Sequence, residues 1–256
     1  AATTGTVSYT AVSGTADELV TDAGNYVTAG INVTVTGDVT LTQIQTIDGY
    51  NAVGTLDYTG TTVTGTAAVL AADAGGYVAG ATAVSVTGAI NMADAATIQG
   101  LFGGAPTVTA FSDTAANIAT VTGDGAGVIA ANSTATITIT DGDISVANAN
   151  LLDALTVGGV TATITEGDLA TLTTLTDANG NNAFTIAVTD TTGVDPADLT
   201  TVDGLTSVNV DATAVLSLSG TAAAIDALLG DDVTLAADVD ITVTGAATIA
   251  QLTAFN

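Results

Sequence analysis

Acidic side chains are the residues of this sequence best suited to hold a ligand, and many of them follow short stretches of alternating apolar and hydroxyl residues. One series runs through the middle of the chain, at Asp113, Asp141, Asp143, Glu166, Asp168 and Asp190. If the repeated strands stack at about 4.8 Å per strand, these carboxylates form a column along one edge. Like charges at that spacing repel and raise each other's pKa, and Ca²⁺, which prefers oxygen ligands, relieves the conflict.

A second acidic group lies in the segment GDDVTLAADVD, which contains Asp231, Asp232, Asp238 and Asp240. The two groups together predict calcium ligands at Asp113, Asp141, Asp143, Glu166, Asp168, Asp190, Asp231 and Asp232. The alternative interpretation is that these residues form turns and helix caps, as Asp commonly does, and keep an acidic protein in solution. The segment DANGN at 177–181 begins like an EF-hand loop, but the sequence that follows lacks the glycine at position six of such a loop and the closing glutamate.

The charge balance excludes several classes of partner. The chain has 256 residues with 26 acids and no lysine or arginine, so its formal net charge is −26. Phosphate backbones and anionic membrane surfaces are bound through basic residues, which excludes nucleic acids and such membranes as partners. No apolar run is long enough to cross a bilayer, so no membrane insertion is expected. Every carboxylate must be solvated, hydrogen-bonded or neutralised by an external cation, which suits a salty or calcium-containing medium outside the cell.

Catalysis is not expected, because the side chains that most enzymes use are missing. The chain contains no histidine, cysteine or lysine, which excludes Ser–His–Asp, Ser–Lys and thiol arrangements as well as most zinc, haem and iron–sulfur sites. The only glutamates are Glu18 and Glu166. We therefore predict that the protein is not an enzyme and that calcium is its only cofactor.

Internal repeats dominate the sequence. One family of segments alternates apolar residues with threonine, and its last hydroxyl residue falls at Thr36, Thr87, Thr140, Thr189 and Thr244. A second family interleaves with it, anchored at Ser13, Thr64, Ser112, Thr165 and Ser219. The ten anchors are about 26 residues apart, which predicts five double repeats at about 1–54, 55–105, 106–158, 159–208 and 209–256.

Each repeat has the same local pattern. ATITIT at 135–140 and FTIAVT at 184–189 alternate with a period of two, which predicts strands with one buried face. GTAAVLAADAGG at 65–76, DTAANIAT at 113–120 and GTAAAIDALLGDD at 220–232 begin with helix-capping residues and end at Gly, Thr or Asp, which predicts short helices. The pattern favours an α/β solenoid of about ten rungs with a parallel sheet; the alternative is an all-β parallel β-helix, since segments such as 167–180 could be strands.

Exposed hydroxyl groups and sequons allow a second kind of function. Outward-facing threonines on successive repeats would form a flat array, as on some ice-binding solenoids, although threonine also simply favours strands. The sequons at Asn32 and Asn132 are glycan acceptor sequences. Tyr26 and Tyr77 occupy matching sites in DAGNY and DAGGY, where a role in capping the core is expected.

SDTAANIAT at 112–120 and GTAAVLAAD at 65–73, with the VTVTG-like strands that follow, resemble the repeats of large bacterial extracellular proteins of the surface-layer, adhesin-like and calcium-binding kinds. The resemblance covers most of the chain. It implies an extracellular or cell-surface location and a structural or adhesive role. The glycine–aspartate nonapeptides of the RTX type are absent, so calcium binding of that type is not implied.

Neither end of the repeat array has the polar cap that solenoids need. Either the chain belongs to a longer array, or subunits associate with themselves, head to tail or laterally. We therefore predict a structural extracellular protein, a self-assembling subunit or segment of a bacterial surface layer, fibre or adhesin. The alternative is a binding module: an adhesin stalk, or a glycan- or ice-binding solenoid, with glycans as the partner.

Overall fold

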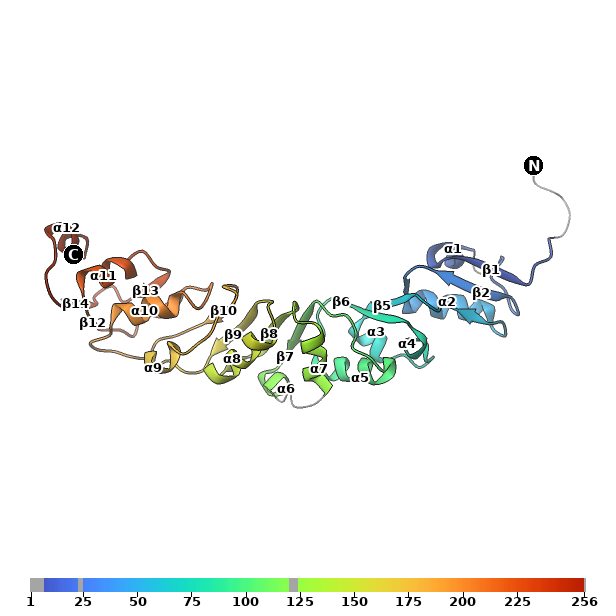
Figure 1. Cartoon of the computed structure of the whole chain (residues 1–256), viewed down its shortest axis with the longest axis horizontal. Coiled ribbons are helices and arrows are strands. Elements are labelled where there is room, and N and C mark those ends of the chain that lie inside the picture. The colour runs from blue at the N-terminus through green and yellow to red at the C-terminus, as the bar shows by residue number, and fades with distance from the viewer. Residues whose placement is uncertain (1–6, 23–24, 120–123, 256) are drawn as a thin grey trace. The chain divides into compact units, whose positions relative to one another are not determined.

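Short strands and short helices alternate throughout the computed structural model (Figure 1). It describes residues 7–22, 25–119 and 124–255. The chain forms two compact units. Unit 1 comprises Ala1–Thr109 and Thr122–Asn132, and unit 2 comprises Ala110–Val121 and Ser133–Asn256.

Unit 1 contains two sheets of three parallel strands, in the orders β1-β2-β4 and β3-β5-β6. The strands are β1 (Ala11–Thr15), β2 (Asn32–Thr36), β3 (Val39–Thr40), β4 (Leu56–Asp57), β5 (Thr62–Thr66) and β6 (Ala83–Thr87). The helices are α1 (Ala16–Thr21), α2 (Leu41–Asn51), α3 (Ala67–Ala71), α4 (Tyr77–Gly80), α5 (Met92–Phe102) and α7 (Asp124–Ala131).

Unit 2 contains a four-stranded parallel sheet in the order β10-β9-β8-β7 and two parallel strand pairs, β11-β13 and β12-β14. The strands are β7 (Ala110–Asp113), β8 (Thr136–Ile144), β9 (Val160–Ile164), β10 (Ala183–Thr185), β11 (Val210–Ala212), β12 (Ser217–Gly220), β13 (Val233–Leu235) and β14 (Asp240–Val243). The helices are α6 (Ala115–Ala119), α8 (Val146–Leu155), α9 (Leu169–Leu172), α10 (Pro196–Asp203), α11 (Ala222–Leu228) and α12 (Ile249–Ala254).

The predicted solenoid is wrong, and so is its all-β alternative. The described residues form a mixed α/β protein with twelve helices and five small sheets of two to four parallel strands. The reason is that the hydrogen-bond ladders between strands are too short and too often interrupted to join the strands into one continuous sheet. The contacts Ala187↔Asp211 and Val194↔Leu218 in unit 2 are isolated bridges, and β3 and β4 have only two residues each. The division into five double repeats stays a prediction.

The local pattern is realised in part: the strand predicted at 184–189 is wrong beyond Thr185, where β10 ends, because only an isolated bridge at Ala187 follows. Segment 135–140 lies largely in β8, and the predicted helical segments 65–76, 113–120 and 220–232 contain α3, α6 and α11. Segment 167–180, for which strand structure was the alternative, contains the short helix α9. Alternation works as expected along β2, where Val33 and Val35 are buried and the residues between and beside them are exposed.

The first half of unit 1, which contains β1 and β2, and the second half, which contains β5 and β6, pair these strands in the same register at an offset of 51 residues. Val12 pairs with Val33 in the first half, and Val63 pairs with Val84 in the second, in the same parallel register. Each half also contains a hydrogen bond from a tyrosine hydroxyl to the backbone carbonyl of a second tyrosine. Tyr9 donates to the carbonyl of Tyr26 (3.0 Å), and Tyr58 donates to that of Tyr77 (3.1 Å). The repeat therefore extends from sequence to hydrogen bonding.

Candidate functional sites

The carboxylates predicted to bind calcium include three that cap helices of an earlier segment. The Asp141 carboxylate accepts a hydrogen bond from the backbone N–H of Ala115 at 2.7 Å, and that of Glu166 accepts one from Val146 at 2.9 Å. Asp190 accepts one from the N–H of Leu169 at 2.7 Å.

Ala115, Val146 and Leu169 are the first residues of α6, α8 and α9. The first N–H groups of a helix have no partner inside the helix and carry its positive partial charge, so a carboxylate is a favourable partner. Each of these three acids thus links its own segment of unit 2, through a hydrogen bond, to the start of a helix 20–26 residues earlier in the chain.

The other predicted ligands of this series have local roles or face solvent. Asp168 is the N-cap of α9, and hydrogen bonds from the side chain and backbone of Thr171 lower its pKa. Asp113 is buried and accepts hydrogen bonds from the N–H of Thr114 and from Asn117 Nδ2. Asp143 lies exposed in β8, paired in register with Thr163.

Calcium binding by this series stays a prediction. The structure places Asp141, Glu166 and Asp190 at helix N-termini, where one oxygen of each carboxylate is already used by an N–H group. Within residues 7–22, 25–119 and 124–255, no three acidic side chains converge closely enough to hold a metal ion. A metal at this series would therefore need side chains to move.

The predicted ligands Asp231 and Asp232 lie beside Asp203, at the end of α10. Burial raises the pKa of Asp203, and the negative charges of Asp231 and Asp232 raise it further. A hydrogen bond from the backbone of Asp232 lowers the pKa but does not outweigh these causes. Asp231 Oδ2 is buried and has no hydrogen-bond partner among the described residues. The sequence signal found two of these three acids but not Asp203, which is distant in the chain.

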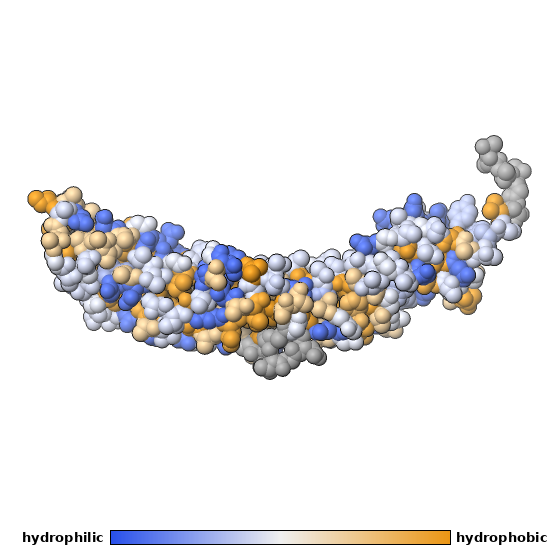
Figure 2. All heavy atoms as spheres, in the orientation of Figure 1, coloured by the Kyte–Doolittle hydropathy of each residue, from blue (hydrophilic) through white to orange (hydrophobic). Residues whose placement is uncertain are grey.

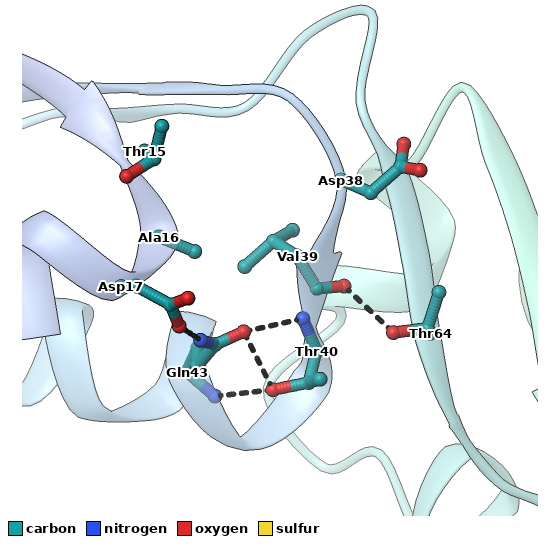
Figure 3. A pocket seen from close by; sticks show the side chains of 8 residues that line it. All are labelled: Thr15, Ala16, Asp17, Asp38, Val39, Thr40, Gln43 and Thr64. Atoms are coloured by element: carbon teal, nitrogen blue, oxygen red, sulfur yellow. Dashed lines mark hydrogen bonds between the residues drawn. The ribbon is translucent and has the colours of Figure 1, made fainter.

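A polar pocket of about 280 Å³ lies in unit 1 between the starts of α1 and α2 (Figure 3). Its lining residues are Thr15, Ala16, Asp17, Asp38, Val39, Thr40, Gln43 and Thr64. Its polar groups largely satisfy one another: Gln43 Nε2 donates to Asp17 at 2.6 Å, Gln43 Oε1 accepts from Thr40, and Thr64 donates to the carbonyl of Val39. This pocket is therefore explained by helix capping without a ligand.

A second recess of about 290 Å³ lies beside β1 and α1, and it is more apolar. Its lining residues are Val12, Ser13, Gly14, Glu18, Leu19, Asp22, Tyr26 and Val27. The Tyr26 side chain is 56 % exposed, and its ring lies 6.1 Å from that of Tyr9. Strand β1 is the edge strand of its sheet as far as the structure describes the chain, so this recess borders a strand edge that no described strand pairs with.

The clearest exposed apolar surface belongs to α12 in unit 2. Ile249 is 85 % exposed and Leu252 is 49 % exposed, and α12 has no buried residue. Figure 2 shows apolar side chains on the surface where Figure 1 places this helix. Strand β14 pairs with β12 alone, and its inward-facing residues Ile241 and Val243 are only half-buried.

The two sequons differ in accessibility. Asn32 is exposed in β2, where its Oδ1 accepts a hydrogen bond from the N–H of Thr55. Asn132 is buried, and its Nδ2 donates to the carbonyls of Pro106 and Val128. A glycan on Asn132 would disrupt these bonds, so Asn32 is the sequon that the structure leaves accessible.

The chain matches no family model, no curated protein and no solved structure. No helix of the described residues is long and apolar enough to cross a membrane. What the protein does must therefore be argued from its own surfaces.

Proposed function

We propose that the protein is a structural, self-associating protein of the cell exterior: a subunit or segment of a surface layer, fibre or adhesin, without catalytic activity. The observation that supports this proposal best is the uncovered apolar face of α12. Helix α2 carries Leu41 and Ile44 where α12 carries Ile249 and Leu252, and both α2 residues are completely buried. Exposing two aliphatic side chains to water is unfavourable in free energy, and association that buries them removes this penalty.

The composition supports the location. A chain with no lysine or arginine has no trypsin site, and one with no cysteine does not depend on the redox state of its surroundings. The net charge of −26 opposes contact between copies unless cations screen it. A salty or calcium-containing exterior would provide that screening, and calcium enters the proposal as a cation that strengthens association.

Sedimentation velocity over a range of protein concentrations tests the proposal. We expect the wild-type chain to associate more strongly as salt is added. We expect calcium to exceed sodium chloride of equal ionic strength. The double variant Ile249→Gln/Leu252→Gln should weaken association at least about tenfold, because burying each aliphatic side chain stabilises by ~1.5–3 kcal/mol.

The matched control is Leu151→Gln/Val157→Gln, which alters two exposed apolar residues elsewhere in unit 2 and should leave association unchanged. Sedimentation that is independent of concentration in every salt would contradict the proposed function. An equal effect of calcium and sodium would remove calcium from the proposal and keep the structural role.

A further inference from the structure

The second half of unit 1 is covered on a side where, among the described residues, no strand or helix covers the first half. In the second half, β5 pairs on that side with β3, through Val39↔Val63 and Thr40↔Thr64. Helix α2 packs against β5 and α4, and the Tyr77 hydroxyl donates a hydrogen bond to Asp48 of α2 at 2.7 Å. The cover is therefore the segment Val39–Asn51, which comprises β3 and α2.

The first half has the same surface without that cover. Val12 and Tyr26 correspond to Val63 and Tyr77 at the offset of 51 residues. Among residues 7–22, 25–119 and 124–255, β1 pairs only with β2, so its other edge has no strand partner there, and residues of β1 line the 290 Å³ recess. Val63 is completely buried, whereas Val12 is half-buried and Tyr26 is mostly exposed.

The segment that leads into α12 is a second copy of the covering segment, at an offset of 208 residues. Gly37 and Gly245 both have positive φ angles, of 79° and 90°. Thr40 and Thr248 then cap their helices in nearly the same conformation, with φ and ψ of −80° and 150° against −81° and 157°.

Each threonine also forms a capping box with the glutamine three residues later. The N–H of Thr40 donates to Gln43 Oε1 at 2.9 Å, and that of Thr248 donates to Gln251 Oε1 at 3.1 Å. The α12 segment therefore begins with the same capping conformation as the α2 segment and carries Ile249 and Leu252 where α2 carries Leu41 and Ile44, although α12 has six residues and α2 has eleven.

We infer that α12 and the preceding Ala247–Thr248 of one copy dock on β1, α1 and Tyr26 of a second copy, head to tail. The contact continues an interface that unit 1 already contains, with Ala247 beside Val12 as Val39 lies beside Val63. The second copy's β1 edge gains a strand partner, and Ile249 and Leu252 enter the recess. This inference rests on the proposed self-association and assigns its geometry.

Cross-linking of single-cysteine variants tests the inference, because the chain has no native cysteine. Partners on adjacent parallel strands lie within the Cα distance that a disulfide spans. A mixture of Val12→Cys and Ala247→Cys chains should form a disulfide-linked heterodimer under mild oxidation. The matched control mixes Val12→Cys with Leu151→Cys, whose exposed position in unit 2 lies outside the proposed contact.

The outcomes separate the inference from the function on which it rests. Heterodimers in the first mixture alone support head-to-tail docking. If the chain associates by sedimentation but the cross-links are Ala247→Cys homodimers, the docking is overturned and self-association is kept. The same holds if the chain associates and the mixed cross-link does not exceed that of the control. Absence of both association and cross-links overturns both.

A second variant tests the receiving side without cysteines. Tyr26→Ala removes an exposed ring from the recess and should weaken association about tenfold. Tyr50→Ala removes another exposed tyrosine of unit 1 and should have no effect on association. Equal effects of the two variants, with the fold intact by circular dichroism, would contradict a specific role of the recess.

Discussion

Helices α2 and α12 share their sequence pattern and their capping chemistry but differ in what surrounds them. Both follow a glycine with positive φ and begin with a Thr–Gln capping box. In α2 the apolar face is completely buried by strands and helices of unit 1, whereas in α12 Ile249 and Leu252 are exposed. The comparison teaches that local sequence sets the helix, while its burial depends on whether a neighbour is present.

The largest effect is expected when matching residues of the two helices are truncated to alanine. Ile44→Ala should lower the free energy of unfolding by about 2–5 kcal/mol, because Ile44 is completely buried. Leu252→Ala at the matching position should cost less than about 1 kcal/mol in the monomer, because the side chain is half in water already. Urea denaturation at a concentration where the chain is monomeric measures both, and equal losses would contradict the comparison.

A smaller effect distinguishes Tyr77 from Tyr26, the tyrosine at the equivalent site of the first half. The hydrogen bond to Asp48 raises the pKa of Tyr77 to about 12, with burial and nearby acids adding to it. The pKa is higher in the folded than in the unfolded state, so the stabilisation is fully present below pH 10 and is lost as the pH rises through 12. Tyr77→Phe should cost about 1 kcal/mol at neutral pH.

Absorbance titration of the phenolate should show that Tyr77→Phe removes the tyrosine that ionises near pH 12. Tyr26→Phe is the matched control for the loss of stability, since its ring occupies the equivalent site without the covering helix. A titration near pH 12 that persists in Tyr77→Phe, or equal losses of stability in the two variants, would contradict the role of the Asp48 hydrogen bond.

Much of the local structure followed from the sequence, but its assembly did not. Alternating residues predicted the strand at 135–140, and a capping residue before an alanine-rich run predicted α11. A single continuous sheet did not follow, because residue alternation fixes which face of a strand is buried and not how far its hydrogen-bond ladder extends. Strand β3, only two residues long, exists as a partner of β5.

The calcium site stays a prediction, whereas the predicted solenoid is wrong. Glu166 and Asp190 follow the strands β9 and β10, whereas Asp141 lies within β8. Spacing could not reveal that helix N–H groups from earlier segments would take an oxygen of each carboxylate. The turn-and-cap alternative describes these residues better than a metal site does. The exposed face of α12 has no signature of its own, since its pattern of capping and apolar residues is that of the buried α2.

Amide hydrogen exchange of α12 at low and high protein concentration is the most direct test of self-association through this helix. The account predicts that the amides of residues 249–254 exchange rapidly in the monomer and become protected as concentration rises. The amides of α2 serve as the internal reference and should be protected throughout. Exchange of α12 that does not change with concentration, in a sample that sedimentation shows to be associated, would contradict the account.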